Sequence, residues 1–452
     1  MLLTLSLVCG CLAGCGGNGD KQNGGKTDPN GTDTEGTTEL TLWCSYTEAS
    51  TAVLKEMVEK FNEEQQGKYH MSVENAGSVN QFRTKLATMK QSDYPSVFFG
   101  IPQAIYEYST EPYTVPIQKY LDEDSDKWTD DMYENVKAAY SDENGNLIGT
   151  PLGLSSRGYM VNVTALEAAG YKLTDITSFE KLAEASQKAV DQGAVKYGYC
   201  VGDGSDIYDM LLYQGVDLFD GENGRNGEVT KSMYTEEETH AALKKLLGMW
   251  AKLWESGASY KNASGTQGGQ SLFVNGNLMF WTCSNSFVYE LSDMKLNFEW
   301  AFLPHVGVDE NAKYKGNALV EGTGLFIANT GNETEMQGAY EFIKFVARTD
   351  NQVFWATYRG YVPYTNEAAA SEEWAAYQRD VFPSSVRLIE MQQSTPADLR
   401  LPYCKLTSQI MAVNSDINSY VMADPTGNLD TYIQDAADSI NESIQILKMR
   451  GQ

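Results

Sequence analysis

Short apolar segments alternate with amphipathic ones from residue 39 onwards, and this alternation restricts the possible folds more than any other feature of the sequence. Residues 39–45 predict a strand with Leu40, Leu42 and Cys44 on one face. Residues 53–61 carry an apolar stripe at helical spacing, and residues 96–100 predict another strand after a proline. Strands that alternate with helices form parallel βαβ units, so we expect an α/β fold.

Two local patterns predict where later elements begin and end. Thr177-Ser-Phe-Glu180 fits a capping box, in which the first and last side chains satisfy backbone amides at the start of a helix. Residues 220–227 are rich in glycine and asparagine, which predicts a loop.

Length and charge limit the kinds of protein this chain can be. A single core rarely extends beyond ~250–300 residues, so the 452 residues predict two domains. The net charge of −27 argues against binding to nucleic acid and against adhesion to an anionic membrane surface. Only three histidines are present, and they are scattered (His70, His240 and His305), so we expect no histidine-based metal site or catalytic triad.

The N-terminus has the features of an export signal. Residues 1–14 are apolar and uncharged, and are too short to span a bilayer. They end in Leu12-Ala-Gly-Cys15, which resembles the bacterial lipobox, so we expect residues 1–14 to be a lipoprotein signal peptide and Cys15 to be lipidated. An ordinary signal peptide is the alternative. The usual basic start is missing, which leaves open a different start of translation or inefficient export. Residues 15–37 lack large apolar side chains and predict a flexible tether.

Four cysteines remain in the body of the chain: Cys44, Cys200, Cys283 and Cys404. Their separations contain no CxxC or metal-ligand spacing. Up to two disulfides are possible outside a cell, but cysteine is also a common small core residue. We expect these cysteines to be mostly unpaired and buried.

The sequence contains no phosphate loop, dinucleotide fingerprint or nucleophile elbow. Residues 122–126 resemble the opening of a calcium loop, but Lys127 and Tyr133 stand where the turn glycine and the bidentate glutamate should be. We therefore expect no catalytic residue, no metal and no cofactor.

A series of segments resembles the extracellular solute-binding proteins (family 1) of bacterial ABC importers, in the carbohydrate and glycerol-phosphate group that includes maltose-binding protein. Each segment is weak evidence by itself, but their order and spacing across residues 40–450 make the resemblance specific. The segments are residues 40–46 (LTLWCSY), 94–100 (YPSVFFG), 148–155 (IGTPLGLS), 272–280 (LFVNGNLMF), 300–304 (WAFLP), 322–327 (GTGLFI), 340–346 (YEFIKFV) and 358–363 (YRGYVP).

This resemblance implies a periplasmic-binding-protein-like α/β fold with two interleaved lobes, hinge crossings and a ligand cleft between the lobes. The implied boundaries are residues 38–148 with 318–363 for lobe 1, residues 151–304 with 366–452 for lobe 2, and crossings near residues 149–153, 304–322 and 362–367.

Ligands in such folds lie at the carboxyl ends of strands. Carried over segment by segment, the resemblance implies a ligand-binding set of Ser45, Tyr46, Thr47, Glu48, Gln103, Ser155, Arg157, Asp203, Asp206, Tyr208, Trp281, Asn285, Gly322, Thr323 and Tyr361. Aromatic rings in this set could stack on the CH faces of a sugar, and its carboxylates and amides could pair with sugar hydroxyls.

We therefore expect the lipid-anchored substrate-binding subunit of an ABC importer, a monomer on the outer face of the cell membrane. It would capture a sugar or oligosaccharide and deliver it to permease subunits without making or breaking a bond. It would touch the membrane only through the lipid anchor. Glycerol phosphate or a polyol is the alternative ligand, although few cations (Arg157 and Arg400) are placed to hold phosphate. A surface glycosidase and a tethered adhesin are the alternatives from other classes.

Overall fold

Three parallel strands begin the first of two β-sheets in the computed structural model, which describes residues 36–261 and 266–450. Strand β1 (Thr38–Cys44) pairs along its whole length with β2 (Tyr69–Asn75), and on its other side with β3 (Val97–Gly100). Helices α1 (Glu48–Glu64) and α2 (Val79–Thr88) connect them. The predicted βαβ arrangement is confirmed. The predicted signal peptide, the lipidated Cys15 and nearly all of the tether lie outside the described residues.

The first sheet is completed by a strand from much later in the chain. Strand β11 (Gly324–Ala328) lies between β3 and β4 (Thr114–Val115), antiparallel to both, and also pairs with β5 (Gly149–Pro151). All five residues of β11 are buried. Helix α13 (Glu333–Val346) packs against β1 and β11.

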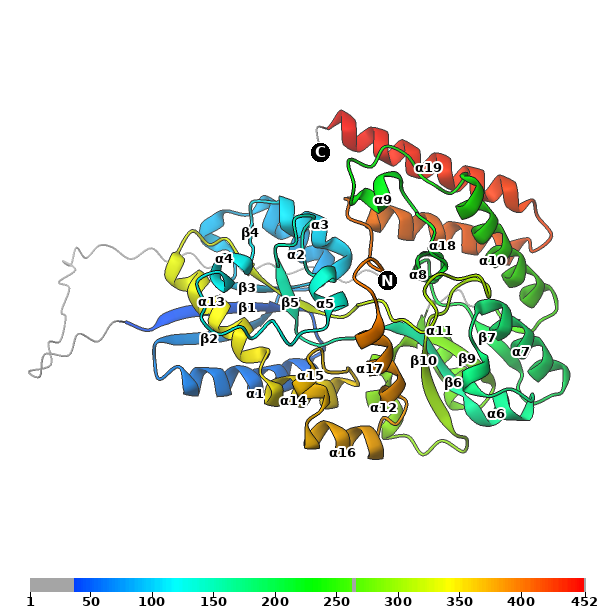
Figure 1. Ribbon diagram of the computed structural model, residues 1–452, viewed down its shortest axis with the longest axis horizontal. Helices are drawn as coiled ribbons and strands as arrows, with labels where there is room; N and C mark the ends of the chain where they lie inside the picture. The colour runs from blue at the N-terminus through cyan, green and yellow to red at the C-terminus, as the bar shows by residue number, and fades with distance from the viewer. Residues whose placement is uncertain (1–35, 262–265, 451–452) are drawn as a thin grey trace, which may run out of the picture. The chain divides into compact units, whose positions relative to one another are not determined.

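The second sheet has the order β10-β6-β9-β7-β8. Strands β10, β6, β9 and β7 are labelled in Figure 1. Its strands are β6 (Arg157–Asn162), β7 (Tyr197–Cys200), β8 (Ser259–Tyr260), β9 (Leu278–Ser284) and β10 (Trp300–Pro304). Strand β7 runs parallel to β8 and β9, whereas β6 runs antiparallel to β9 and β10. The start of β6 therefore lies at the same edge as the carboxyl ends of β7, β9 and β10.

A separate apolar core supports this sheet. It is formed with α6 (Val163–Ala168), α7 (Phe179–Asp191), α8 (Ser205–Gln214), α10 (Glu237–Glu255), α18 (Thr407–Ala423) and α19 (Leu429–Met449). Further helices are α3 (Ile105–Thr110), α4 (Gln118–Leu121), α5 (Glu134–Ala139), α9 (Asp220–Gly224), α11 (Thr266–Val274), α12 (Val288–Ser292), α14 (Thr349–Arg359), α15 (Asn366–Ala369), α16 (Glu372–Asp380) and α17 (Ser385–Ser394), with 3₁₀ turns η1 (Gln91–Asp93), η2 (Pro102–Ala104), η3 (Leu173–Asp175) and η4 (Asn285–Phe287).

The chain passes from the first sheet to the second between β5 and β6, and returns between β10 and β11. The two connections touch, because Ser155 and Glu321 exchange backbone hydrogen bonds of 3.1 and 2.9 Å. Gly322 permits this contact: its φ is +113°, and an added Cβ would lie 2.5 Å from the Gly153 carbonyl oxygen. The boundaries of the two lobes stay a prediction.

Two local expectations need correction. Ser178, not Thr177, caps α7, because its hydroxyl accepts from the Lys181 amide, while the Thr177 hydroxyl donates to Glu310. Residues 220–227 are not loop throughout, since α9 forms a short turn there. Its residues Gly221, Glu222 and Asn223 have left-handed backbone angles, with φ of 53–62°.

Cys44, Cys283 and Cys404 are free and buried, which confirms the expectation for these three, and Cys200 is also buried. Within residues 36–261 and 266–450, no helix is long and apolar enough to cross a membrane.

Candidate functional site

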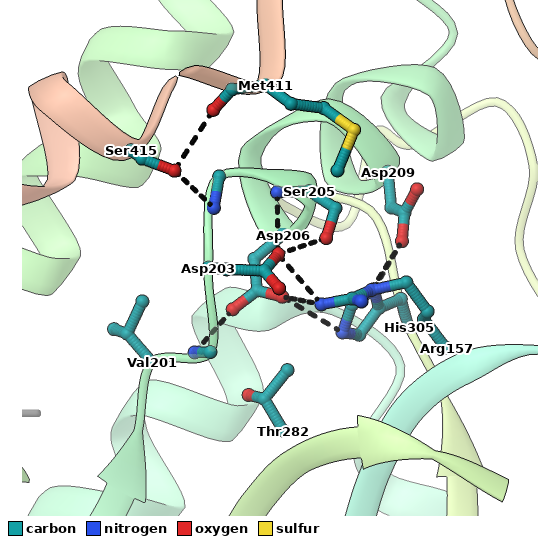
Figure 2. Close-up of polar contacts among 12 residues, drawn as sticks. Arg157, Val201, Asp203, Ser205, Asp206, Asp209, Thr282, His305, Met411 and Ser415 are labelled. Atoms are coloured by element: carbon teal, nitrogen blue, oxygen red, sulfur yellow. Dashed lines mark hydrogen bonds and ion pairs between the residues drawn. The ribbon is translucent and has the colours of Figure 1, made fainter. Parts of the chain in front are cut away.

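Charged side chains gather where the start of β6 meets the carboxyl ends of β7 and β10 (Figure 2). Arg157 begins β6, Asp203 follows β7, and His305 directly follows β10. Helix α8 begins two residues after Asp203 and adds two more carboxylates. The Arg157 cluster consists of Arg157, Asp203, Asp206, Asp209, His305 and Glu321.

Arg157 is the centre of this cluster. Its Nη2 donates to Asp203 Oδ1 at 3.0 Å and to Asp206 Oδ1 at 3.2 Å, and its Nε lies 3.7 Å from Asp209 Oδ2. His305 Nδ1 lies 3.0 Å from the same Asp209 oxygen (Figure 2). Asp206, Asp209 and His305 are almost completely buried.

Glu321 links the Arg157 cluster to the first sheet. Its Oε1 accepts a 3.3 Å hydrogen bond from Nε2 of Gln103, which lies in the turn after β3. Because the Glu321 backbone also pairs with Ser155, this carboxyl group is fixed at the connection between the two sheets. Polar groups from both sheets therefore meet at one place.

Burial and neighbouring charges shift the pKa values of these groups in different directions. Burial alone would raise the pKa of Asp203, but Arg157 and hydrogen bonds from Ser205 lower it. Burial raises the pKa of Asp206 to about 6, although His305 and Arg157 oppose the shift. Burial lowers the pKa of His305 to about 4, so this imidazole is neutral at pH 7.

The Glu321 carboxyl group has a pKa well above its usual value, first because it is buried and then because Asp209 is negatively charged. Arg157 stays charged: the four surrounding carboxyl groups raise its pKa more than burial lowers it. The Arg157 cluster thus contains one permanent cation and four acids. It can both donate and accept hydrogen bonds. Within the described part of the chain, no group of His, Cys, Asp or Glu is arranged to hold a metal ion.

A second group, on the first sheet, contains Tyr46 and Tyr361. The Tyr46 hydroxyl donates to Thr323 Oγ1 at 3.0 Å. The Arg359 guanidinium lies 5.1 Å from the centre of the Tyr46 ring and 5.8 Å from that of Tyr361, and donates to Ser50 at 2.9 Å. Tyr46 is half-buried, whereas Tyr361 is 6% exposed.

Several predicted ligand residues have other partners in this structure. Asn285 is completely buried: its Oδ1 accepts from the Ser156 amide and its Nδ2 donates to the Gly360 carbonyl, each at 2.7 Å. Trp281 and Tyr208 are 0% and 2% exposed and lie within the apolar cores. The structure brings neither Asn285 nor Trp281 to the surface of the Arg157 cluster, whereas the buried Tyr208 hydroxyl has no hydrogen-bond partner among the described residues and the charges of Asp209 and Glu321 act on it.

The predicted residues after β1 lie at the start of α1. Thr47 caps this helix through a hydrogen bond from the Ser50 amide, Ser45 is half-buried and Glu48 is exposed. The structure thus brings together Arg157, Asp203, Asp206 and Gln103, with Ser155 and Gly322 in the adjacent connections and Tyr46, Thr323 and Tyr361 in the second group.

Four residues with polar contacts here were absent from the predicted set. Asp209 lies one turn after Asp206 on α8, so helical spacing could have identified it. Glu321 directly precedes the predicted Gly322. His305 and Arg359 gave no local signal, because only the pairing of β10 with β6 and the position of α14 bring them to this place.

Residues 403–407 contact the segment that runs from Gln103 along α3. Thr407 donates to the Gln103 carbonyl at 2.9 Å, Ser109 and Tyr403 hydroxyls are 2.6 Å apart, and Lys405 donates to Glu111 at 2.7 Å. A cavity of about 330 Å³ lies beside these contacts, between Tyr106 and Tyr403 on one side and α19 on the other. We call residues 403–407 the strap.

Comparison with protein families gives a match over most of the chain. A profile of the family described as "Bacterial extracellular solute-binding protein" matches residues 56–381. The sn-glycerol-3-phosphate-binding periplasmic protein UgpB of Shigella flexneri is 24% identical over 239 residues, which is 52% of each chain. This match spans about half the length of that relative.

Solved structures resemble nearly the whole fold. The sugar-binding protein MalE from Xanthomonas citri has a TM-score of 0.73 at 15% identity, with 91% of this chain and 98% of MalE covered. UgpB from Mycobacterium tuberculosis, in complex with glycerophosphocholine, has a TM-score of 0.73 at 16% identity, with 92% and 100% covered. The expected two-lobe α/β fold is confirmed.

Proposed function

Because the chain belongs to the bacterial extracellular solute-binding protein family, we propose that it captures a sugar or oligosaccharide outside the cell and delivers it to the permease of an ABC importer. The observation that carries this proposal is the position of the Arg157 cluster. It lies at the carboxyl ends of strands in one sheet, and Glu321 connects it to Gln103 of the other.

The chemistry of the Arg157 cluster suits hydroxyl groups. Each sugar hydroxyl donates and accepts a hydrogen bond, and a buried group left without a partner costs about 1–3 kcal/mol. Ionised Asp203 accepts, Arg157 donates, and a protonated Glu321 can do both. The half-buried Tyr46 ring offers an aromatic face for a sugar ring.

A phosphorylated ligand is the second candidate, because both UgpB proteins are named for or bound to glycerol-phosphate compounds. The charge balance favours a neutral saccharide, since the ionised acids around the single arginine of the Arg157 cluster, among them Asp203, would repel a phosphate dianion. Arg359, near Tyr46, is the residue through which a phosphate would be held if this second candidate were correct.

To capture a ligand without converting it chemically, the two lobes must close around it. In this proposal the connections at Ser155 and Glu321 act as the hinge, and the strap contacts α3 in the closed form. Lipidation of Cys15 and the tether over residues 15–37 would hold the protein at the outer face of the membrane as a monomer. The ligand would be released unchanged.

Thermal unfolding of the purified protein with a panel of saccharides, polyols and glycerol 3-phosphate tests the proposal. A ligand at 100 times its Kd adds about 2.7 kcal/mol to the free energy of unfolding, which raises the Tm measurably. The Arg157→Gln variant should lose this rise, whereas Arg379→Gln, at an exposed ion pair with Asp380, should keep it.

The outcomes separate the alternatives. A rise with glycerol 3-phosphate alone would replace the saccharide by the second candidate. Chemical conversion of the saccharide during incubation would identify a glycosidase, and a bound peptide in native mass spectra would identify an adhesin. An unchanged Tm across the whole panel would remove the main support for the proposal.

A further inference from the structure

A second cavity, separate from the Arg157 cluster, lies beneath the short turn α9. Its volume is about 270 Å³. The end of α8, the α9 turn, residues 313–314 and residues 398–401 form its walls. Since one water molecule occupies about 30 Å³ in the liquid, this cavity has room for about nine non-hydrogen atoms.

Two arginines face this cavity without an acidic partner. Arg225 and Arg400 are half-buried, and neither forms an ion pair with any carboxylate in the part of the chain that the structure describes. The Arg225 Nη2 donates to the Leu401 carbonyl at 3.3 Å and its Nη1 to the Ser141 carbonyl at 3.5 Å, both longer than an ordinary hydrogen bond. Its buried Nε has no partner.

The two positive charges act on each other. Burial and the charge of Arg400 lower the pKa of Arg225 to about 10, so Arg225 still carries its charge at pH 7. Its guanidinium lies 4.5 Å from the centre of the Tyr403 ring, which fixes the position of the charge. An arginine pair without a carboxylate is notable in a chain with a net charge of −27.

Two carboxylates line the same cavity, and they also lack a cationic partner within ion-pair distance in the described residues. Asp217 is half-buried, and burial followed by the charge of Glu222 raises its pKa. Glu222 is exposed. The third cation and third acid of the lining, Lys313 and Asp398, pair with each other at 3.2 Å and leave no net charge.

The backbone at Glu222 has an uncommon conformation. Glu222 and Asn223 have φ of 53° and 58°, a left-handed conformation that non-glycine residues seldom adopt. Asn223 supports the turn: its Oδ1 accepts from the Leu218 and Phe219 amides, and its Nδ2 donates to Asp217 at 2.8 Å. Such strained positions cluster at ligand sites.

We propose that this cavity binds a small zwitterion, with its oxyanion against Arg225 and Arg400 and its ammonium group between Asp217 and Glu222. A ligand of this kind relieves both like-charge pairs at once, whereas a simple anion relieves one pair and approaches the other. The oxyanion can be a phosphate or a carboxylate, because arginine binds either through paired N–H donors. The cavity shares no lining residue with the Arg157 cluster.

Isothermal titration calorimetry on the full chain, purified in a nonionic detergent, tests the proposal with four probes. O-phosphoethanolamine and β-alanine carry both charges, inorganic phosphate carries the negative one, and ethylammonium carries the positive one. At least one zwitterion should bind tenfold or more tightly than phosphate or ethylammonium. The stronger of the two zwitterions identifies the oxyanion.

Two variants assign the charges. Arg400→Gln should weaken the zwitterion and phosphate at least tenfold. Glu222→Gln should weaken the zwitterion and ethylammonium but leave phosphate binding equal or stronger. The control Arg379→Gln should bind all probes like the wild type.

Two results would overturn the proposal: phosphate binding as tightly as the stronger zwitterion, which would make this an anion site, or no heat from any probe at millimolar concentrations. Saccharide binding should be unchanged in Glu222→Gln, so a failure of this proposal is distinguishable from a failure of the saccharide proposal.

Discussion

Asn285 illustrates how a polar residue near the site can serve the fold. Its side-chain amide is completely buried and joins the Ser156 amide to the Gly360 carbonyl, two points 204 residues apart in the sequence. Removing a buried amide leaves both backbone groups without a partner, and each costs about 1–3 kcal/mol. Asn285 therefore fixes β9 against the connections between the sheets.

We expect Asn285→Ala to lower the free energy of unfolding by about 2–4 kcal/mol, because two buried backbone groups lose their partners. Urea unfolding followed by tryptophan fluorescence measures this loss. Asn144→Ala, at an exposed turn, is the matched control and should change stability by less than about 0.5 kcal/mol. Equal effects of the two substitutions would show that the Asn285 hydrogen bonds contribute nothing.

The buried acid and imidazole of the Arg157 cluster predict opposite pH dependences. The pKa of Asp206 rises from 3.8 to about 6 in the folded protein, so the folded state binds a proton more readily and stability falls as the pH rises through this window. The pKa of His305 falls from 6.5 to about 4, so the unfolded state binds more protons and stability rises with pH.

Between pH 4 and pH 6.5, Asp206→Asn should therefore gain about 2–3 kcal/mol of stability relative to the wild type, since each pKa unit corresponds to about 1.4 kcal/mol. His305→Gln should lose stability relative to the wild type over the same interval. Urea unfolding of the three proteins at both pH values gives these differences. Differences of the same sign in the two variants would contradict the assigned shifts.

For single residues, position after a strand was the signal from which part of the site could be predicted. Asp203 and Asp206 follow β7, and Arg157 follows a predicted crossing; they meet because β6 runs antiparallel to β9, which puts its start at the edge where β7 ends. The position of Trp281 was harder to predict, because β9 is buried on both faces. Its sequence therefore lacks the alternation that would identify an exposed side.

The start of α7 shows what local sequence can and cannot determine about an element. Thr177 and Ser178 are both good capping residues, so composition places the start only within one residue. Glu310, from a loop 132 residues later, accepts hydrogen bonds from both hydroxyls. Ser178 is completely buried and makes the capping contact to Lys181.

We expect Ser178→Ala to lower the free energy of unfolding by about 1 kcal/mol, since it removes the cap of α7. Thr177→Ala, the matched neighbour, should cost less because its hydroxyl does not cap the helix. Chemical unfolding of the two variants measures the difference. A larger loss in Thr177→Ala would restore the capping box that the sequence suggested.

The strands of the first sheet also differ in how far local sequence determines their place. β1 and β3 were predictable because each has a strand pattern of its own, at residues 39–45 and 96–100. The place of β11 between β3 and β4 was not, because both of these strands lie more than 200 residues before it and no local pattern specifies the pairing. Non-local pairing of this kind is what interleaves the two sheets.

For the whole molecule, the strap is the feature that relates the fold to ligand capture. Its Tyr403 ring packs against the Tyr106 ring at 4.9 Å, and its hydroxyl lies 2.6 Å from that of Ser109. Helix α3 belongs with the first sheet, whereas the Tyr403 amide donates to the Asn223 carbonyl of α9, beside the second core. The strap contacts therefore exist only when the two sides are together.

Ligand affinity should depend on these contacts although they do not touch the Arg157 cluster. If the proposed closure holds, a substitution that weakens the strap lowers the closed population, and the apparent affinity falls by the same factor. We expect Tyr403→Ala to weaken binding of the saccharide identified by thermal unfolding about 5- to 50-fold, which corresponds to about 1–2 kcal/mol of lost contact. Tyr420→Ala, at an exposed tyrosine of α18, is the control and should bind like the wild type. Calorimetric titration gives both affinities, and equal affinities in the two variants would mean that the strap is not part of closure.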